Sequence, residues 1–93
     1  SKQRQHRSKL KTVRLRPKTD PHMLEIRVNK ARQFLERGDK VQLMILFRGR
    51  EMAHQELGMK HCKEVAARLE DIARVEQHPR MEGRRMTMLL SRK

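Results

Sequence analysis

The run VQLMILF, residues 41–47, constrains the fold more than any other stretch of this 93-residue chain. Successive side chains of a β-strand point to opposite sides, and one side of this run is wholly apolar: Val41, Leu43, Ile45 and Phe47. The other side is mixed, which is typical of a sheet with one face open to solvent. The uninterrupted apolar part, Leu43–Phe47, is far too short to span a bilayer. The sequence therefore predicts a central strand whose apolar side is covered by helices.

Helical patterns stand before and after this strand. In the first, Asp20 is expected to be the N-cap, Pro21 the first helical residue and Gly38 the C-cap. Its apolar stripe repeats at spacings of three and four residues and consists of Leu24, Val28, Ala31 and Leu35, with Phe34 alongside. The second helix is expected from about Ala53 to Ile72, with the stripe Cys62, Val65, Ala66, Leu69, Ile72 and Ala73.

Three further segments are predicted to be strands. LKTVRL (10–15) alternates and ends before Pro17, which favours a short edge strand, whereas RVEQHP (74–79) and RMTMLLS (85–91) flank a turn at RMEGR (80–84). Strand–helix–strand units favour parallel pairing, and the last two strands should form an antiparallel hairpin. We therefore predict an α+β fold, a two-layer α/β sandwich of order βαβαββ, with a four-stranded mixed sheet and both helices packed on one face.

Charge points to a polyanionic partner. The net charge of +13 opposes compaction unless a partner neutralises it, so nucleic acid, an anionic membrane surface and an acidic protein are the candidates. Residues 1–9 are predicted to be a basic flexible arm or linker, either a solubilising tail or a direct RNA contact, and residues 10–93 the folded domain. The sequence has a single cysteine, Cys62, and no secretory signal pattern, which favours a reducing cytoplasm.

Catalytic chemistry finds little support in the sequence. Glu51, His54 and Glu56 form the only tight acid/base group, and no nucleophile accompanies them, so helix capping and a surface histidine are expected. His61 and Cys62 lack the further ligands that a zinc site needs. We predict no catalytic residue, no metal site and no cofactor. An RNA-processing enzyme built on Glu51 and His54 stays open as an alternative that would require turnover.

Binding is better supported, because cations gather at loops and on the first helix. Arg48 and Arg50 flank Gly49, and Gly83 precedes two further arginines at the expected hairpin tip. Each loop is either a solvated basic turn or a means of presenting guanidinium groups, which can bind phosphate through two hydrogen bonds. The chain has no Trp or Tyr, so contacts should be to phosphate and sugar rather than stacked bases. A DNA-compacting or general polyanion binder remains the alternative in a different class.

Two long motifs, FRGREMAHQELGM (47–59) and VEQHPRMEGRRMTMLL (75–90), resemble the C-terminal domain of bacterial translation initiation factor 3. KTVRLRPKTDPH (11–22) and ARQFLERGDKV (31–41) sit where that family has similar segments. The resemblance implies a non-enzymatic domain that binds the small (30S) ribosomal subunit through 16S rRNA and prevents association with the large subunit. It also implies support for initiator tRNA and start codon selection, with indirect contact to initiator tRNA and mRNA, no membrane partner and a monomeric state.

The resemblance also assigns the RNA-binding residues. Family contact positions correspond to Arg16, Arg27, Arg48, Arg50 and Arg84, and with neighbouring cations the predicted site is Arg16, Lys18, Arg27, Lys30, Arg32, Arg48, Arg50, Arg84 and Arg85. The chain departs from the family at Asn29, Gln33 and Glu64, where the family usually has basic residues. Whether these departures shift the RNA-binding face is left open by the sequence.

Overall fold

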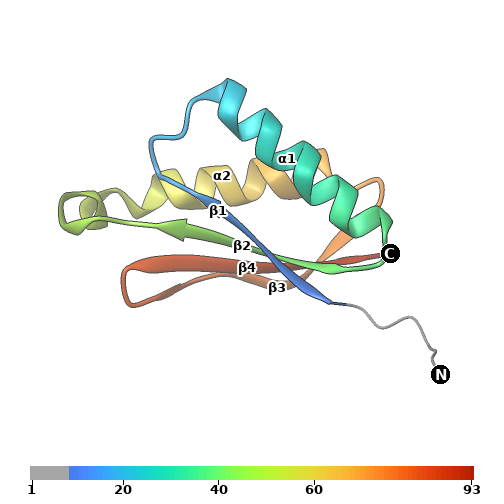
Figure 1. Ribbon diagram of the computed structural model, residues 1–93. Helices are drawn as coiled ribbons and strands as arrows, with labels where there is room; N and C mark the ends of the chain where they lie inside the picture. The colour runs from blue at the N-terminus through green and yellow to red at the C-terminus, as the bar shows by residue number, and fades with distance from the viewer. Residues whose placement is uncertain (1–8) are drawn as a thin grey trace.

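The computed structural model describes residues 9–93, and the predicted arm lies almost wholly outside them. The elements, in chain order, are β1 (Leu10–Leu15), α1 (Pro21–Glu36), β2 (Lys40–Leu46), the 3-10 helix η1 (Gly49–His54), α2 (Gln55–Arg68), β3 (Ala73–Glu82) and β4 (Arg85–Arg92). The sheet order is β1-β2-β4-β3, with β1 parallel to β2 and β4 antiparallel to both of its neighbours. Figure 1 shows both helices on one face of the sheet, which confirms the predicted α+β two-layer sandwich.

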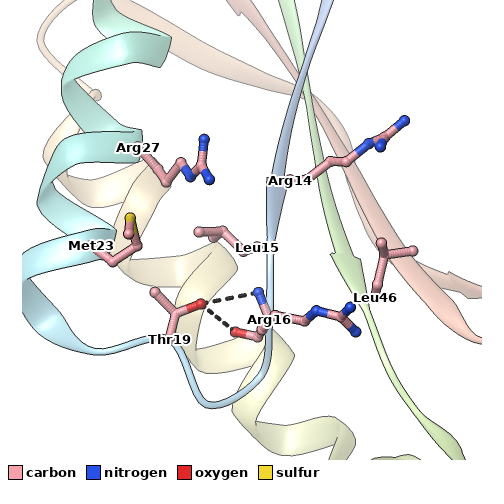
Figure 2. A pocket seen from close by; sticks show the side chains of 7 residues that line it. All are labelled: Arg14, Leu15, Arg16, Thr19, Met23, Arg27 and Leu46. Atoms are coloured by element: carbon pink, nitrogen blue, oxygen red, sulfur yellow. Dashed lines mark hydrogen bonds between the residues drawn. The ribbon is translucent and has the colours of Figure 1, made fainter.

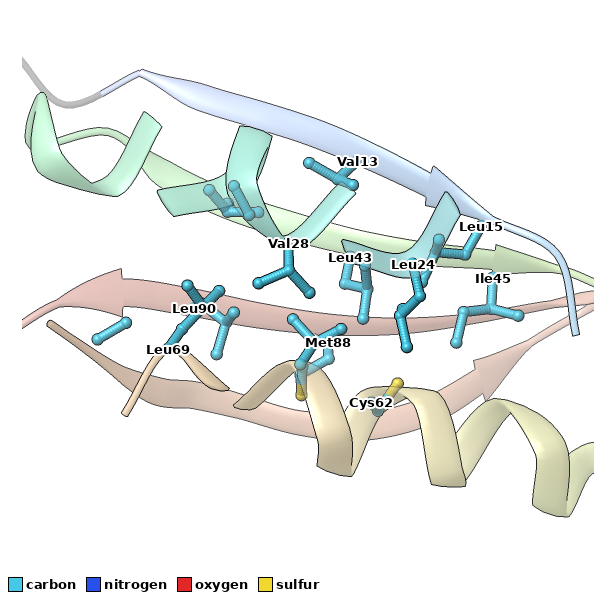
Figure 3. Packing of buried hydrophobic residues seen from close by; sticks show 14 of the residues in the cluster. Val13, Leu15, Leu24, Val28, Leu43, Ile45, Cys62, Leu69, Met88 and Leu90 are labelled. Carbon is cyan, nitrogen blue, oxygen red and sulfur yellow. The ribbon is translucent and has the colours of Figure 1, made fainter. Parts of the chain in front are cut away.

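The core lies between the sheet and the two helices. The apolar side of the central strand is buried as predicted, from Val41 to Phe47, and so is the whole stripe of α1. Figure 3 shows Leu24 and Val28 of α1 pointing toward the strand residues Leu43 and Met88. Phe34 is only half-buried, because it packs at the margin of the core with the ammonium of Lys11 5.8 Å from its ring centre. Phe34 thus lies beside the buried stripe of α1, as predicted, but is not part of the fully buried core.

Helix α1 begins where the sequence predicts. The Asp20 carboxylate accepts a hydrogen bond from the Met23 backbone N–H at 2.7 Å, and Pro21 occupies the first turn. The capping residue at the other end is Arg37, one residue before the predicted Gly38. Gly38 follows in the left-handed region with φ of 91°, which lets the chain reverse into β2.

The second helical segment differs from its prediction at both ends. It starts as the 3-10 turn η1, and α2 ends at Arg68, so that Ile72 and Ala73 lie outside the helix. The end of α2 is capped by a side chain from α1: Arg32 donates to the Arg68 carbonyl at 2.8 Å and pairs with Asp71 at 2.8 Å. The predicted stripe continued past the helix because the buried Ala73 is the first residue of β3.

The hairpin turn is shorter than predicted. Arg80, Met81 and Glu82 belong to β3 and pair with Thr87, Met86 and Arg85. Only Gly83 and Arg84 remain in the turn, with Gly83 at φ of 65°. Farther back along β3 the register with β4 shifts twice between Val75 and Arg80, and the outer edge of the sheet is irregular there.

Candidate nucleic-acid interface

The strand directions bring three connections to one end of the molecule. β1, β2 and β3 run the same way and β4 runs against them, so the β1–α1 turn, the β2–η1 connection and the β3–β4 hairpin meet there. Figure 1 shows the β2–η1 connection and the hairpin side by side at this end. We name it the basic end, after the residues it gathers: Arg16, Lys18, Arg27, Arg48, Arg50, Arg84 and Arg85.

Three open hollows mark the surface of the basic end. The first, about 410 Å³, surrounds the end of β1, where Figure 2 shows Arg27 extending from α1 on one side and Arg14 and Arg16 on the side of Leu46. The second, about 560 Å³, is lined by Lys18, Arg48, Gly49, Arg50 and Glu51. The third, about 390 Å³, is lined by Leu46, Phe47, Glu82, Gly83, Arg84 and Arg85. Leu46 lines both the first and the third hollow, so these two adjoin.

The carboxylates near the basic end are already engaged. Glu51 accepts a hydrogen bond from the Arg48 backbone N–H at 2.8 Å, and Asp20 caps α1. Glu82 pairs with Arg80 at 3.1 Å and accepts a hydrogen bond from the Thr87 hydroxyl at 3.2 Å. Within residues 9–93, no hydrogen bond or ion pair engages a side chain of the basic-end cations. The guanidinium and ammonium groups are therefore available to an anion from outside.

The β1–α1 turn is closed by its own hydrogen bonds. The Thr19 hydroxyl accepts from the Arg16 backbone N–H at 3.0 Å and donates to the Arg16 carbonyl at 2.7 Å. The Thr19 backbone N–H donates to the same carbonyl at 3.1 Å, and Pro17 between them is fully buried. Arg16 and Lys18 thus project from a defined turn rather than from a loose loop.

The two glycines singled out in the sequence differ in their need for glycine. Gly83 requires it, because its φ of 65° is unfavourable for other residues. Gly49 has no positive φ, and a Cβ built there meets nothing within 4 Å. The fold by itself therefore accepts a side chain at position 49.

Lys30 and Arg32 stand apart from the other predicted RNA-binding residues. Lys30 is exposed one turn after Arg27 and extends the cationic surface along α1 without lining any of the three hollows. The side chain of Arg32 is held at the end of α2 by Asp71 and the Arg68 carbonyl. This hydrogen bond lowers the pKa of Asp71 and raises the pKa of Arg32. Arg32 therefore has a structural role that its position in the sequence did not reveal.

Arg14 lines the first hollow and was missing from the predicted site. Its signal was in the strand pattern, because the alternation of β1 places it on the open face, two residues before Arg16. Of the three departures from the family pattern, Asn29 and Gln33 are exposed on α1, and Glu64 pairs with Arg68 at 2.8 Å. None of these three lines a hollow of the basic end.

The acid/base group has the expected capping geometry. Glu51 binds the Arg48 backbone, and His54 lies exposed with its Nδ1 3.3 Å from Glu56. Among residues 9–93, no cluster of three or more histidine, cysteine or acidic side chains is arranged to hold a metal ion. Cys62 is fully buried, as predicted, and its burial raises the pKa of the thiol to about 12.

No helix in the described part of the chain has both the length and the apolar character needed to cross a membrane.

Comparison with known proteins gives a consistent family match. Residues 8–93 match the family described as translation initiation factor IF-3, C-terminal domain. Relatives named translation initiation factor IF-3 include the Zymomonas mobilis protein, 49% identical over 89 residues, and the Aromatoleum aromaticum protein, 48% identical over 90. These alignments cover 96% and 97% of this chain and 50% and 52% of the relatives, so the chain spans about half their length. The matched family consists of translation factors rather than enzymes, which agrees with the prediction of a non-catalytic domain.

Proposed function

The chain belongs to the family of the C-terminal domain of translation initiation factor IF-3, and from this premise we propose that its basic end binds the 16S rRNA of the 30S ribosomal subunit. The observation that carries the proposal is the collection of unengaged cations at one end of the sandwich, beside carboxylates that are already bonded. A folded RNA offers phosphates at many positions, and a rigid array of cations selects those whose spacing fits.

The contacts proposed are to the RNA backbone. The two phenylalanines of the chain are the buried Phe47 and the half-buried Phe34, so neither offers a platform on which a base could stack. Guanidinium groups instead bind phosphate oxygens in a bidentate manner and release condensed counterions. Recognition by this domain then depends on the shape of the RNA and on the spacing of its phosphates.

The proposed action follows from the space that the bound domain occupies on the 30S subunit. A two-layer sandwich fixed to the 30S surface occupies space that the large subunit would need, so joining of the subunits is prevented without any chemical step. Initiator tRNA and mRNA would be affected indirectly, through the state of the 30S subunit. We further propose that the domain acts as a monomer in the cytoplasm, where ribosomes initiate translation. In this proposal residues 1–9 are a basic arm and residues 10–93 are the ribosome-binding domain.

Binding of the chain to purified 30S subunits, together with dissociation of 70S ribosomes, tests this proposal. Arg48→Ala and Arg50→Ala should each weaken 30S binding by about 1–2 kcal/mol, the worth of a charged hydrogen bond, and leave the thermal midpoint nearly unchanged. The double variant should lose most subunit-dissociating activity. Unchanged 30S binding by the double variant would remove the β2–η1 connection from the interface.

Competition distinguishes this function from general polyanion binding. At equal salt the chain should prefer 30S subunits to duplex DNA, whereas a DNA-compacting protein would show no such preference. Incubation of RNA with the wild-type chain and with His54→Ala addresses the enzymatic alternative. Cleavage that depends on His54 would contradict a purely binding role.

A further inference from the structure

Within residues 9–93, His61 makes the only side-chain hydrogen bond between α2 and the β1–α1 turn. Its Nε2 lies 2.8 Å from the Pro17 carbonyl oxygen, across 44 positions of sequence. A carbonyl oxygen can only accept, so the imidazole must carry its proton on Nε2. The neutral ring then presents a lone pair at Nδ1, and Nδ1 is buried with no hydrogen-bond partner in the described residues.

An unpartnered buried nitrogen is costly to the fold. If position 61 served only to fill space between α2 and the turn, an aliphatic side chain of similar size would pack there without this penalty. What the imidazole provides and a hydrocarbon cannot is the N–H that reaches the Pro17 carbonyl. The geometry therefore favours a role for the hydrogen bond itself.

The Pro17 carbonyl is a sensitive place to attach the turn. The bonds between Arg16 and Thr19 close the turn on itself, but they do not fix its orientation relative to the rest of the molecule. Pro17 lies between Arg16, which lines the first hollow, and Lys18, which lines the second. The hydrogen bond from His61 ties this carbonyl to α2, at a position directly between the two cations.

We propose that His61 is a positioning residue that orients the β1–α1 turn, and with it Arg16 and Lys18, for contact with RNA phosphates. His61 touches no RNA in this proposal and acts only through the turn. The effect on RNA binding rests on the proposed function, whereas the effect on the turn does not.

Two substitutions at position 61 separate the hydrogen bond from packing. His61→Leu keeps a similar volume and removes the N–H, while His61→Gln supplies an amide N–H near the place of Nε2. His78→Leu, at an exposed histidine on β3, is the matched control for the loss of an imidazole. Measurements are the imidazole tautomer by ¹⁵N NMR, amide hydrogen exchange at Arg16 and Thr19, and 30S affinity at several salt concentrations.

The wild-type ring should show the tautomer protonated at Nε2. His61→Leu should speed exchange in the turn and lower 30S affinity by about fivefold, the worth of one hydrogen bond. Its logarithmic salt slope should fall by roughly 0.7–0.9, as expected if one phosphate contact is lost. His61→Gln should restore all three readouts toward wild type, and His78→Leu should change none of them.

The proposal fails if the ring is protonated at Nδ1, or if His61→Leu leaves exchange in the turn at the wild-type rate. It also fails if His61→Gln behaves like His61→Leu in a folded protein. If His61→Leu does not fold, the imidazole tautomer of the wild type and the behaviour of His61→Gln still test the proposal. Absence of 30S binding by the wild type would overturn the proposed function, and the tautomer and exchange data would still judge the role of His61 in the turn.

Discussion

Gly49 and Gly58 lie nine residues apart in the sequence but have opposite surroundings. A Cβ at Gly58 on α2 would lie 2.7 Å from Cζ of the buried Phe47 and 3.2 Å from the sulfur of Met86, whereas a Cβ at Gly49 would meet nothing within 4 Å. Glycine at position 58 is thus needed for α2 to approach the sheet. At position 49 the fold makes no such demand, and close approach of a partner is the remaining reason for a glycine.

The same substitution at both sites should separate these roles. Gly58→Ala gains about 1 kcal/mol of helix propensity but costs about 1–3 kcal/mol through overpacking, so a net loss of stability of about 1 kcal/mol is expected. Gly49→Ala should leave stability unchanged or slightly raised, because it restricts the unfolded chain, yet it should weaken 30S binding. Urea unfolding and 30S titration measure the two effects. Wild-type 30S affinity in Gly49→Ala would show that the RNA does not approach this backbone.

Cys62 gives the molecule a predictable sensitivity to alkaline pH. Burial raises the pKa of its thiol from 9.0 to about 12, so the folded state keeps the proton where the unfolded chain releases it. Below about pH 8 the thiol is protonated in both states and contributes no pH dependence. Above about pH 9 the unfolded state binds fewer protons, and stability should fall by up to 1.36 kcal/mol per pH unit until the folded thiol also ionises. Comparing urea unfolding of the wild type and Cys62→Ala at about pH 7 and pH 10 isolates this contribution, and equal pH dependence in the two proteins would refute it.

The element that presents Arg48 and Arg50 is the short helix η1, and Glu51 holds its start. The Glu51 carboxylate bonds the Arg48 backbone N–H at 2.8 Å while lying among cations that are proposed to bind RNA. Removing its charge should favour RNA binding, whereas removing its hydrogen bond should loosen the connection. The two effects oppose each other, so a single substitution cannot separate them.

Glu51→Gln and Glu51→Ala make the same change in charge and differ in the acceptor that remains. Glu51→Gln keeps an oxygen for the Arg48 N–H and should bind 30S subunits at least as tightly as wild type. Glu51→Ala should be less stable than Glu51→Gln by about 1 kcal/mol, the usual worth of a cap, and should bind more weakly than the Gln variant. Equal 30S affinity of the two variants would mean that the cap does not organise the connection.

At the level of elements, the sequence predicted what local signals encode. The Asp20–Pro21 start of α1 is a signal within one turn, and its apolar stripe repeats every three or four residues along a single helix. The alternation of β2 is a property of seven neighbouring residues. The end of α2 was not predictable in this way, because no glycine or proline marks it and Arg32 caps it from 36 residues away. The pairing of Arg80–Glu82 with β4 was likewise hidden, since RMEGR has the composition of a turn.

For the whole molecule, the position of a cation should matter more than the net charge. Arg50 at the basic end and Arg37 at the far end of α1 are both exposed, and replacing either by Gln lowers the net charge by one. Arg50→Gln should reduce 30S affinity and lower the logarithmic salt slope by roughly 0.7–0.9, whereas Arg37→Gln should change both only slightly. Titration of 30S subunits at several salt concentrations measures this. Equal losses in the two variants would favour nonspecific attraction by the total charge.

The candidate site is a property of the whole molecule and was only partly predictable. The resemblance named individual arginines, and the strand order explains why three distant loops carry them to one end. Neither the family resemblance nor the strand order could show that Arg32 pairs with Asp71 or that His61 contacts Pro17. Both contacts join residues about forty positions apart in the sequence. Such pairs depend on how helices sit on the sheet, which no local pattern encodes.

The irregular register of β3 has a consequence for how copies of the domain coexist. An outer strand with regular, unoccupied amides can recruit another strand and start a growing aggregate. Here one margin of the sheet is interrupted between Val75 and Arg80, with Pro79 offering no amide hydrogen, and the opposite margin carries Arg14 and the flanking Lys9 and Lys11. Both margins thus discourage edge-to-edge recruitment of a further strand, although one side of the sheet is left uncovered by helices.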